Sequence, residues 1–195
     1  AQHPVVCFDE ASKQIVSEVR RPLPPTPGQP ECYDFEYRRE GTCNLFLGCE
    51  PLRGWRNISV TERRTKCDWA EWVKELLEVH YPEAEKIVLV MDNLNTHTPS
   101  ALYEVFPPDE AKRLWDRLEI HYTPKHGSWL NIAEIELSVL SQQCLNRRFA
   151  DREHLEQEVA AWERQRNAKG GKVDWRFTTA DARIKLKRLY PVIHE

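Results

Sequence analysis

The sequence has no apolar run approaching the ~20 residues that a membrane-spanning helix needs. Its first residues, AQHPVVCFDE, lack the basic region and the long apolar stretch of a secretory signal. We therefore expect a cytoplasmic protein. Apolar residues make up 41% of the 195 positions and charged residues 30%. These proportions fit one soluble domain, large enough for a sheet covered by helices.

The six cysteines include no C-x-x-C pair, and no histidine pair lies near them at zinc-finger spacing. Zinc sites and disulfide frameworks usually show tighter and more regular spacing. We expect all six to be reduced and structural. Cys7 and Cys144 fall on apolar patterns and should be small core residues.

The chain also lacks the basic surplus that is typical of nucleic-acid-binding proteins, since its net charge is −3. The negative net charge argues only weakly against DNA binding, because a catalytic site built from several carboxylates itself makes the net charge more negative. Basic residues are still clustered at Arg147-Arg148 and across Arg183 to Arg188.

Apolar periodicity predicts an α/β fold without internal repeats. Strands are expected at 4–9, 41–50, 52–62, 87–91 and 118–123, and helices at 68–80, 99–117, 128–146, 151–166 and 179–189. Asp68 is the expected N-cap of its helix, Pro107-Pro108 should divide the segment 99–117, and Gly170-Gly171 should end the helix that begins at 151. The order predicts a mixed sheet of about five strands flanked by helices. We expect residues 1–150 to form the core and 151–195 to add C-terminal helices that pack on the same domain.

Two acids, Asp9 and Asp92, end apolar strands, and a third, Glu134, lies on the helix after the strand at 118–123. Carboxyl ends of parallel strands open into the crevice where α/β proteins bind ligands. Three carboxylates meeting there would repel one another unless hard cations such as Mg²⁺ joined them, and two such ions support phosphodiester chemistry. By spacing alone the signal is weak, because an acid after a strand more often forms a turn or caps a helix.

The segments VVCFDEAS, VLVMDNLNTHT and HYTPKHGSWLNIAEIELSVL resemble the DDE endonuclease domain of bacterial insertion-sequence transposases in the mariner superfamily. The resemblance extends through YDFEYRREGTCNLFLGCEPLRGW and FPPDEAKRL to FTTADARIKLKRLYP. It implies a ribonuclease-H-like fold, with Asp9, Asp92 and Glu134 as catalytic residues and ligands of two Mg²⁺ ions, for which Mn²⁺ can substitute. The chain departs from the family's L-N-P-I-E by having Ile132-Ala133, and its spacing from Asp92 to Glu134 is long for the superfamily.

Two of these assignments have a competitor nearby. Helical geometry does not decide between Glu134 and Glu136, which flank the apolar stripe on opposite sides, and only the family register favours Glu134. Glu10 competes with Asp9, but alternation along the strand points adjacent side chains to opposite faces.

Weaker candidates for DNA contact lie in the loops around these acids and after the catalytic helix: Asn93, His97, Lys125, His126, Arg147 and Arg148. The first two could orient metal-bound water or a DNA phosphate, or could simply make turn and capping hydrogen bonds. The pair before the helix could contact the DNA end or lie in a solvated loop. The arginines could bind phosphates or complement a helix dipole. Trp129 is expected to be a packing residue.

The proline-rich segment at 20–30 cannot be helical and should leave the core as a rigid extended arm. The resemblance suggests a clamp that reaches a second protomer in a homodimeric paired-end complex; an ordinary surface connection is the alternative. The resemblance and the abrupt start also suggest a helix-turn-helix DNA reader upstream.

The function expected from the resemblance is that of a transposase. Water would cleave a phosphodiester at the transposon end, and the freed 3′-hydroxyl would then attack target DNA, with TA dinucleotides favoured. The expected location is the cytoplasm, on the bacterial nucleoid. The alternatives are another nuclease on the same fold and a catalytically silent, transposase-derived DNA-binding or assembly domain.

Overall fold

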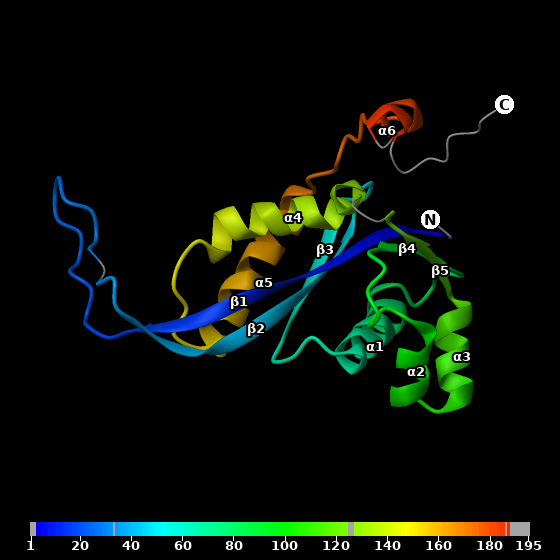
Figure 1. The fold of residues 1–195 in the computed structure, drawn as a ribbon, viewed down its shortest axis with the longest axis horizontal. Helices are drawn as coiled ribbons and strands as arrows, with labels where there is room; N and C mark the ends of the chain where they lie inside the picture. The colour runs from blue at the N-terminus through cyan, green and yellow to red at the C-terminus, as the bar shows by residue number, and fades with distance from the viewer. Residues whose placement is uncertain (1–2, 33, 125–126, 186, 188–195) are drawn as a thin grey trace.

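The structure, a computed structural model, describes residues 3–32, 34–124, 127–185 and 187. Its centre is a five-stranded sheet in the order β3-β2-β1-β4-β5 (Figure 1). The strands are β1 (Val5–Glu18), β2 (Tyr37–Glu50), β3 (Trp55–Thr61), β4 (Ile87–Met91) and β5 (Leu118–Tyr122). The first three are antiparallel neighbours, whereas β4 and β5 run parallel to β1. The expected mixed sheet is confirmed.

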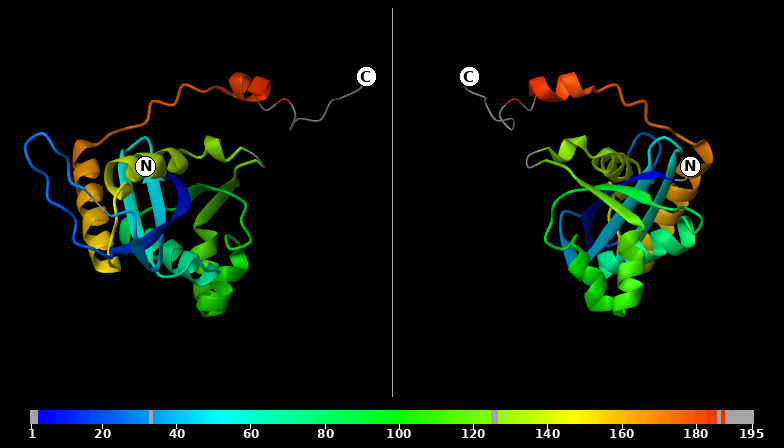
Figure 2. Two further views of the ribbon diagram at one scale, coloured as in Figure 1. Left: turned by 60° about the vertical axis from the view of Figure 1, so that its left-hand side comes forward. Right: turned by 90° about the vertical axis from the view of Figure 1, so that its right-hand side faces the viewer.

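Helices cover both faces of this sheet. On one side lie α1 (Lys66–Glu75), the π-helical turn Leu76–His80, α2 (Pro99–Val105) and α3 (Pro108–Asp116). On the other lie α4 (Ile132–Leu140), which follows a short turn at Ser128–Leu130 and continues as a π-helical turn at Ser141–Leu145, and α5 (Arg152–Lys169). A last helix, α6 (Thr179–Lys185), buries none of its residues. Helix α5 packs on this face through Leu155, Val159 and Trp162, whereas α6 stands away from the core (Figure 2).

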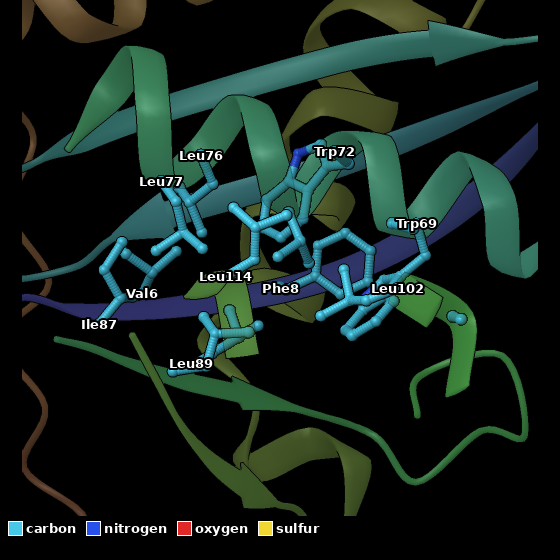
Figure 3. Packing of buried hydrophobic residues seen from close by; sticks show 14 of the residues in the cluster. Val6, Phe8, Trp69, Trp72, Leu76, Leu77, Ile87, Leu89, Leu102 and Leu114 are labelled. Atoms are coloured by element: carbon cyan, nitrogen blue, oxygen red, sulfur yellow. The ribbon is translucent and has the colours of Figure 1, made fainter. Parts of the chain in front are cut away.

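Each face has its own core. The first joins Phe8 of β1 to Trp69 and Trp72 of α1, with leucines of the neighbouring helices around them (Figure 3). The second is built from β1, β2, α4 and α5, and buries Ala133, Leu140, Leu155, Val159 and Trp162. Burial of both faces explains why β4 reads as an uninterrupted apolar run.

Strand β1 is longer than its apolar run predicts. It continues from Val5 to Glu18, so Asp9 lies within the strand and the expected end at position 9 is wrong. Past Cys7 the strand loses its partner β4 and pairs only with β2. A strand with one neighbour and one solvated face tolerates polar residues, and the segment EASKQIVSE therefore gives no continuous apolar signal.

Helix α1 begins earlier than expected. Its N-cap is Thr65, not Asp68, because Asp68 occupies the third helical position and completes a capping box with Thr65. The division at Pro107-Pro108 is confirmed, and α5 ends at Gly170, whose positive φ of 56° is the left-handed conformation that suits glycine. The last helix ends at Lys185 within the described residues, short of the expected 189.

The segment between β1 and β2 projects from the body as a long arm, described here for residues 19–32 and 34–36 (Figure 1). Two isolated bridges, Leu23 with Cys32 and Thr26 with Gln29, hold its two sides together. The arm exposes large apolar side chains, with Phe35 85% and Leu23 68% accessible. The expectation of a proline-rich segment that leaves the core is confirmed.

The apolar content of the helices and the state of the cysteines can be compared with the expectations from composition. In the described part of the chain, no helix is both long and apolar enough to cross a bilayer. All six cysteines are free thiols; Cys7, Cys43, Cys49 and Cys144 are buried. The other two, Cys32 and Cys67, are exposed.

Candidate functional site

The parallel pairing of β1 and β4 brings Asp9 and Asp92 to the same place. Cys7 pairs with Val90, so continuing this register by two residues puts Asp9 level with Asp92. Residues two apart on a strand point to the same face. Asp9 therefore shares the face of Cys7, which is the face covered by α4, and Asp92 follows directly after the end of β4.

The electrostatics of Asp9 show that Glu134 belongs to the same group. Burial raises the pKa of Asp9, and the negative charges of Asp92, Glu134 and Glu10 raise it further, to about 6. The backbone N–H of Glu10 donates to Asp9 Oδ1 at 2.8 Å and opposes this rise only in part. The charges of Asp92, at the end of β4, and of Glu134, on α4, thus both act on Asp9 at one end of the parallel strands.

Asn131 fixes the end of α4 that carries Glu134. Its Oδ1 accepts from the backbone N–H of Ala133, which caps the helix, and its Nδ2 donates to the carbonyl oxygen of Phe8 at 2.7 Å. The residue is 1% exposed. The same side chain therefore starts α4 and ties it to the strand position next to Asp9, while Glu134 lies exposed in the first helical turn.

The competing acid, Glu136, points into the protein and is 2% exposed. Its carboxylate accepts two hydrogen bonds from Arg56, at 2.9 and 3.0 Å, and two from Arg166, at 3.0 and 3.2 Å. Burial raises its pKa, but the two guanidinium groups outweigh burial and hold it below the ordinary value. Glu136 thus joins β3, α4 and α5, and Glu134 is the acid of this pair that faces the group around Asp9.

His97 lies beside Asp92 and is fully buried. Its Nδ1 is 3.0 Å from Asp92 Oδ1 and its Nε2 is 3.5 Å from Glu10 Oε2. Burial lowers the pKa of His97, yet hydrogen bonds to the two carboxylates outweigh burial and raise it to about 9. The ring also packs edge-on against Phe8, with 5.3 Å between centroids. His97 is therefore a cationic support for Asp92, enclosed by the core rather than facing the surface where DNA would lie.

Glu10 continues this network on the face opposite Asp9. Its side chain is 4% exposed, and Arg64 Nε lies 3.3 Å from its Oε1. The alternation expected along β1 is therefore observed: Asp9 faces α4, whereas Glu10 faces the core of α1 and holds His97.

The remaining candidates for DNA contact lie in three places. Asn93 is exposed directly after Asp92. Arg147 and Arg148 follow the far end of α4, where they line a pocket of about 370 Å³ with Lys13 and pair with Glu158 and Glu18. Lys125 and His126 lie outside the described residues.

The donor set suits a hard cation, because it offers carboxylate oxygens from Asp9, Asp92 and Glu134. A cation there would relieve the repulsion that raises the pKa of Asp9. Within the described ranges, however, no three His, Cys, Asp or Glu side chains form a group close enough to hold one ion as they stand. The arrangement is thus open, and ligation by these three residues stays a prediction.

Comparison with known proteins assigns the family. The model of the DDE superfamily endonuclease family matches residues 4–156. Among solved structures, the Mos1 mariner paired end complex with Mn is similar, with a TM-score of 0.56, 17% identity, and coverage of 85% of this chain and 49% of the other. The Mos1 Strand Transfer Complex has a TM-score of 0.53 and 15% identity, covering 89% of this chain and 56% of the other.

No curated protein sequence matches the chain significantly. The chain spans about half the length of the Mos1 chains, and at these identities the likeness shows the fold alone. That fold is the ribonuclease-H-like sheet of a mariner transposase catalytic domain, as expected. Together with the family match over most of its length, this establishes that the chain belongs to the DDE superfamily endonucleases.

Proposed function

We propose that the chain is the catalytic domain of a cut-and-paste DNA transposase. One observation carries the proposal: a DDE endonuclease fold in which the charges of Asp92 and Glu134 act on Asp9 at one end of the parallel strands. The substrate would be the phosphodiester at a transposon end, and the product 3′-hydroxyl would attack target DNA in a second in-line displacement.

Asp9, Asp92 and Glu134 would hold two divalent ions, Mg²⁺ or Mn²⁺. Bound there, such ions supply Lewis acidity that activates the attacking oxygen and stabilises the leaving one. His97 holds Asp92 in one orientation through its Nδ1, and Asn131 sets the position of the helical turn that carries Glu134. These two residues act on the acids and not on the DNA.

The partners follow from the same proposal. The DNA would comprise transposon ends and a target with TA dinucleotides, and the active form would be a homodimer in a paired-end complex. The exposed apolar side chains of the arm support a protein contact, because large apolar groups in a projecting segment favour burial against a second surface. The source would be a bacterial insertion sequence, and the site of action the cytoplasm, on the nucleoid.

The test is cleavage and joining of DNA bearing transposon ends, with Mg²⁺ or Mn²⁺. Asp92→Asn should abolish both steps. Asp151→Asn is the matched control, because this acid caps α5 and asparagine caps a helix equally well. Wild-type activity in Asp92→Asn would refute the proposal.

The same assay separates the two rival functions. A nuclease of another kind on this fold would cleave RNA–DNA hybrids or junctions without transposon ends, and it would not join strands. A silent assembly domain would bind DNA without cleaving it, and calorimetry would detect no Mn²⁺ binding that depends on Asp92.

A further inference from the structure

The C-terminal segment forms a strap that is attached to the body at two places. We define the strap as residues 171–187, of which 186 is not described. At its base, Arg56 donates to the carbonyl oxygen of Gly171 at 2.6 Å. The backbone N–H of Val173 donates to the carbonyl oxygen of Pro51 at 3.1 Å. From there the strap runs along the outside of the molecule and ends in α6 (Figure 2).

The far attachment of the strap is at Trp129, in the short turn that precedes α4. The ring of Phe177 packs edge-on against Trp129 with 5.0 Å between centroids, and Trp175 packs on Phe177 at 6.1 Å. Lys185 of α6 places its Nζ 4.3 Å from the centre of the Trp129 ring, a cation–π contact. The strap is therefore held next to the helix end that carries Glu134, and it lies outside the residues matched by the family model.

Among the described residues, the helix at the end of the strap makes few contacts with the body, of which the Lys185–Trp129 contact is one. Thr178 and Asp181 make a capping box that starts α6. None of the residues of α6 is buried, and Ile184 is 78% exposed. Seven residues are too few for a stable isolated helix, so α6 depends on what it touches. The exposed residues of α6, Arg183 and Ile184 among them, are accessible to a ligand from outside the described chain.

The charge of the strap identifies that ligand as a polyanion. The chain as a whole has a net charge of −3. The described strap reverses this sign, because it has two acids and more than twice as many cations: Lys172, Arg176, Arg183, Lys185 and Lys187. Both acids already have local partners, since Asp174 pairs with Arg176 and Asp181 caps α6.

We infer that the strap binds the phosphodiester backbone of DNA beside the three acids, without reading its sequence. The carboxylates repel the strand that they must approach, and a cationic element held next to α4 offsets that repulsion. This inference rests on the proposed function, because it takes DNA as the substrate. It adds a binding surface that is separate from the acids.

The test measures the affinity of the chain for a labelled duplex without transposon ends, in EDTA, over a range of salt concentrations. In the strap variant, Lys172, Arg183 and Lys187 are each changed to Gln; all three are exposed. The dissociation constant should rise about tenfold or more. The slope of log K against log salt should shrink by about 2 to 3, because each lost phosphate contact removes about 0.9.

A matched control loses the same charge at the opposite end of the parallel strands. Lys86→Gln, Lys112→Gln and Arg113→Gln lie just before β4 and on α3 and are also exposed. This variant should keep the wild-type affinity within about twofold and keep the salt slope. Circular dichroism and thermal unfolding of both variants should match the wild type, because exposed charges contribute little to stability.

Each outcome decides a different claim. Unchanged affinity in the strap variant, or an equal loss in both variants, overturns the strap inference and leaves the proposed function standing if the wild type still cleaves DNA. A wild-type chain that neither binds nor cleaves DNA overturns both.

Discussion

Nδ2 of Asn131 donates a hydrogen bond to the carbonyl oxygen of Phe8 across 2.7 Å, so that the cap of α4 and the strand next to Asp9 are joined by one side chain. The distance between Glu134 and Asp9 therefore depends on a residue that is not itself an acid. This makes Asn131 a positioning residue, whose role can be separated from that of the acids.

Asn131→Asp should lower the cleavage rate by at least tenfold. Aspartate keeps the cap oxygen but places a carboxylate against the Phe8 carbonyl in a buried position, which displaces the start of α4. Asn44→Asp is the control, because Asn44 is also buried and donates to a carbonyl, that of Glu62. Both variants should lose about 1–3 kcal/mol of stability. An equal loss of kcat in both would show that Asn131 is only structural.

His97→Gln should reduce cleavage about 10- to 100-fold, the usual effect of removing a residue that orients a metal ligand. Glutamine removes the cation between Asp92 and Glu10 and leaves the acids in place. A titration of activity with Mn²⁺ should show a higher half-saturating concentration. His80→Gln serves as a control, since His80 packs against Trp55 on the far side of α1. Unaltered metal dependence in His97→Gln would contradict this role.

Asp9→Asn should make the metal-free protein more stable at neutral pH. The pKa of Asp9 is about 6 in the folded protein and 3.8 ordinarily, so the folded state holds this proton more tightly. The free energy of unfolding should therefore fall as pH rises from about 4 to about 6, by up to about 3 kcal/mol. Denaturant unfolding in EDTA should give the variant a larger free energy of unfolding than the wild type above pH 6. Below pH 4 the two values should be equal. Equal stability at pH 7.5 would disprove the raised pKa of Asp9, to which burial contributes most and the neighbouring carboxylates add.

Glu134→Gln and Glu136→Gln should have opposite phenotypes. The first changes an exposed residue and should remove cleavage while leaving the unfolding transition in place. The second leaves Arg56 and Arg166 without their shared anion and should cost about 3–5 kcal/mol. Chemical denaturation and cleavage assays on the two purified variants would show which glutamate is needed for cleavage and which for stability. Full cleavage activity in Glu134→Gln would contradict this assignment.

The pH dependence of the Glu136 contribution has the opposite sign to that of Asp9. Its folded pKa lies below the ordinary 4.5, so its contribution is present above pH 4.5 and is lost as pH falls through the folded value. As the pH falls, the free energy of unfolding of the wild type should therefore drop further than that of Glu136→Gln. Identical acid unfolding curves would count against the ion-pair network.

The sequence predicted the strands and helices that have a strong apolar pattern. Strand β4 and the division at Pro107-Pro108 follow from local residues, and the structure agrees with both. The second half of β1 differs from the prediction because its partner residues in β2 are 19 or more positions away and because only one of its faces is covered. Strand pairing of this kind has no local signature in the residues that form it.

The resemblance predicts Asp9, Asp92 and Glu134, and it names His97 only as a weak candidate; Asn131 is not among the predicted residues. Periodicity could not separate Glu134 from Glu136, because the difference lies in Arg56 and Arg166, which are distant in sequence. Asn131 had a readable signal, since asparagine before an apolar helical run is a favourable N-cap. Its bond to Phe8, and the burial of His97 against Glu10, depend on the packing of separate elements and could not be read from either segment.

The three acids come from β1, from the end of β4 and from the start of α4, so no single segment of the chain contains all three carboxylates. In a partly unfolded chain the three carboxylates lie far apart, because they belong to distant segments of the sequence. Under the function proposed above, cleavage would therefore require β4 to be paired with β1 and α4 to be tied to β1, so that DNA is cut only by the folded domain.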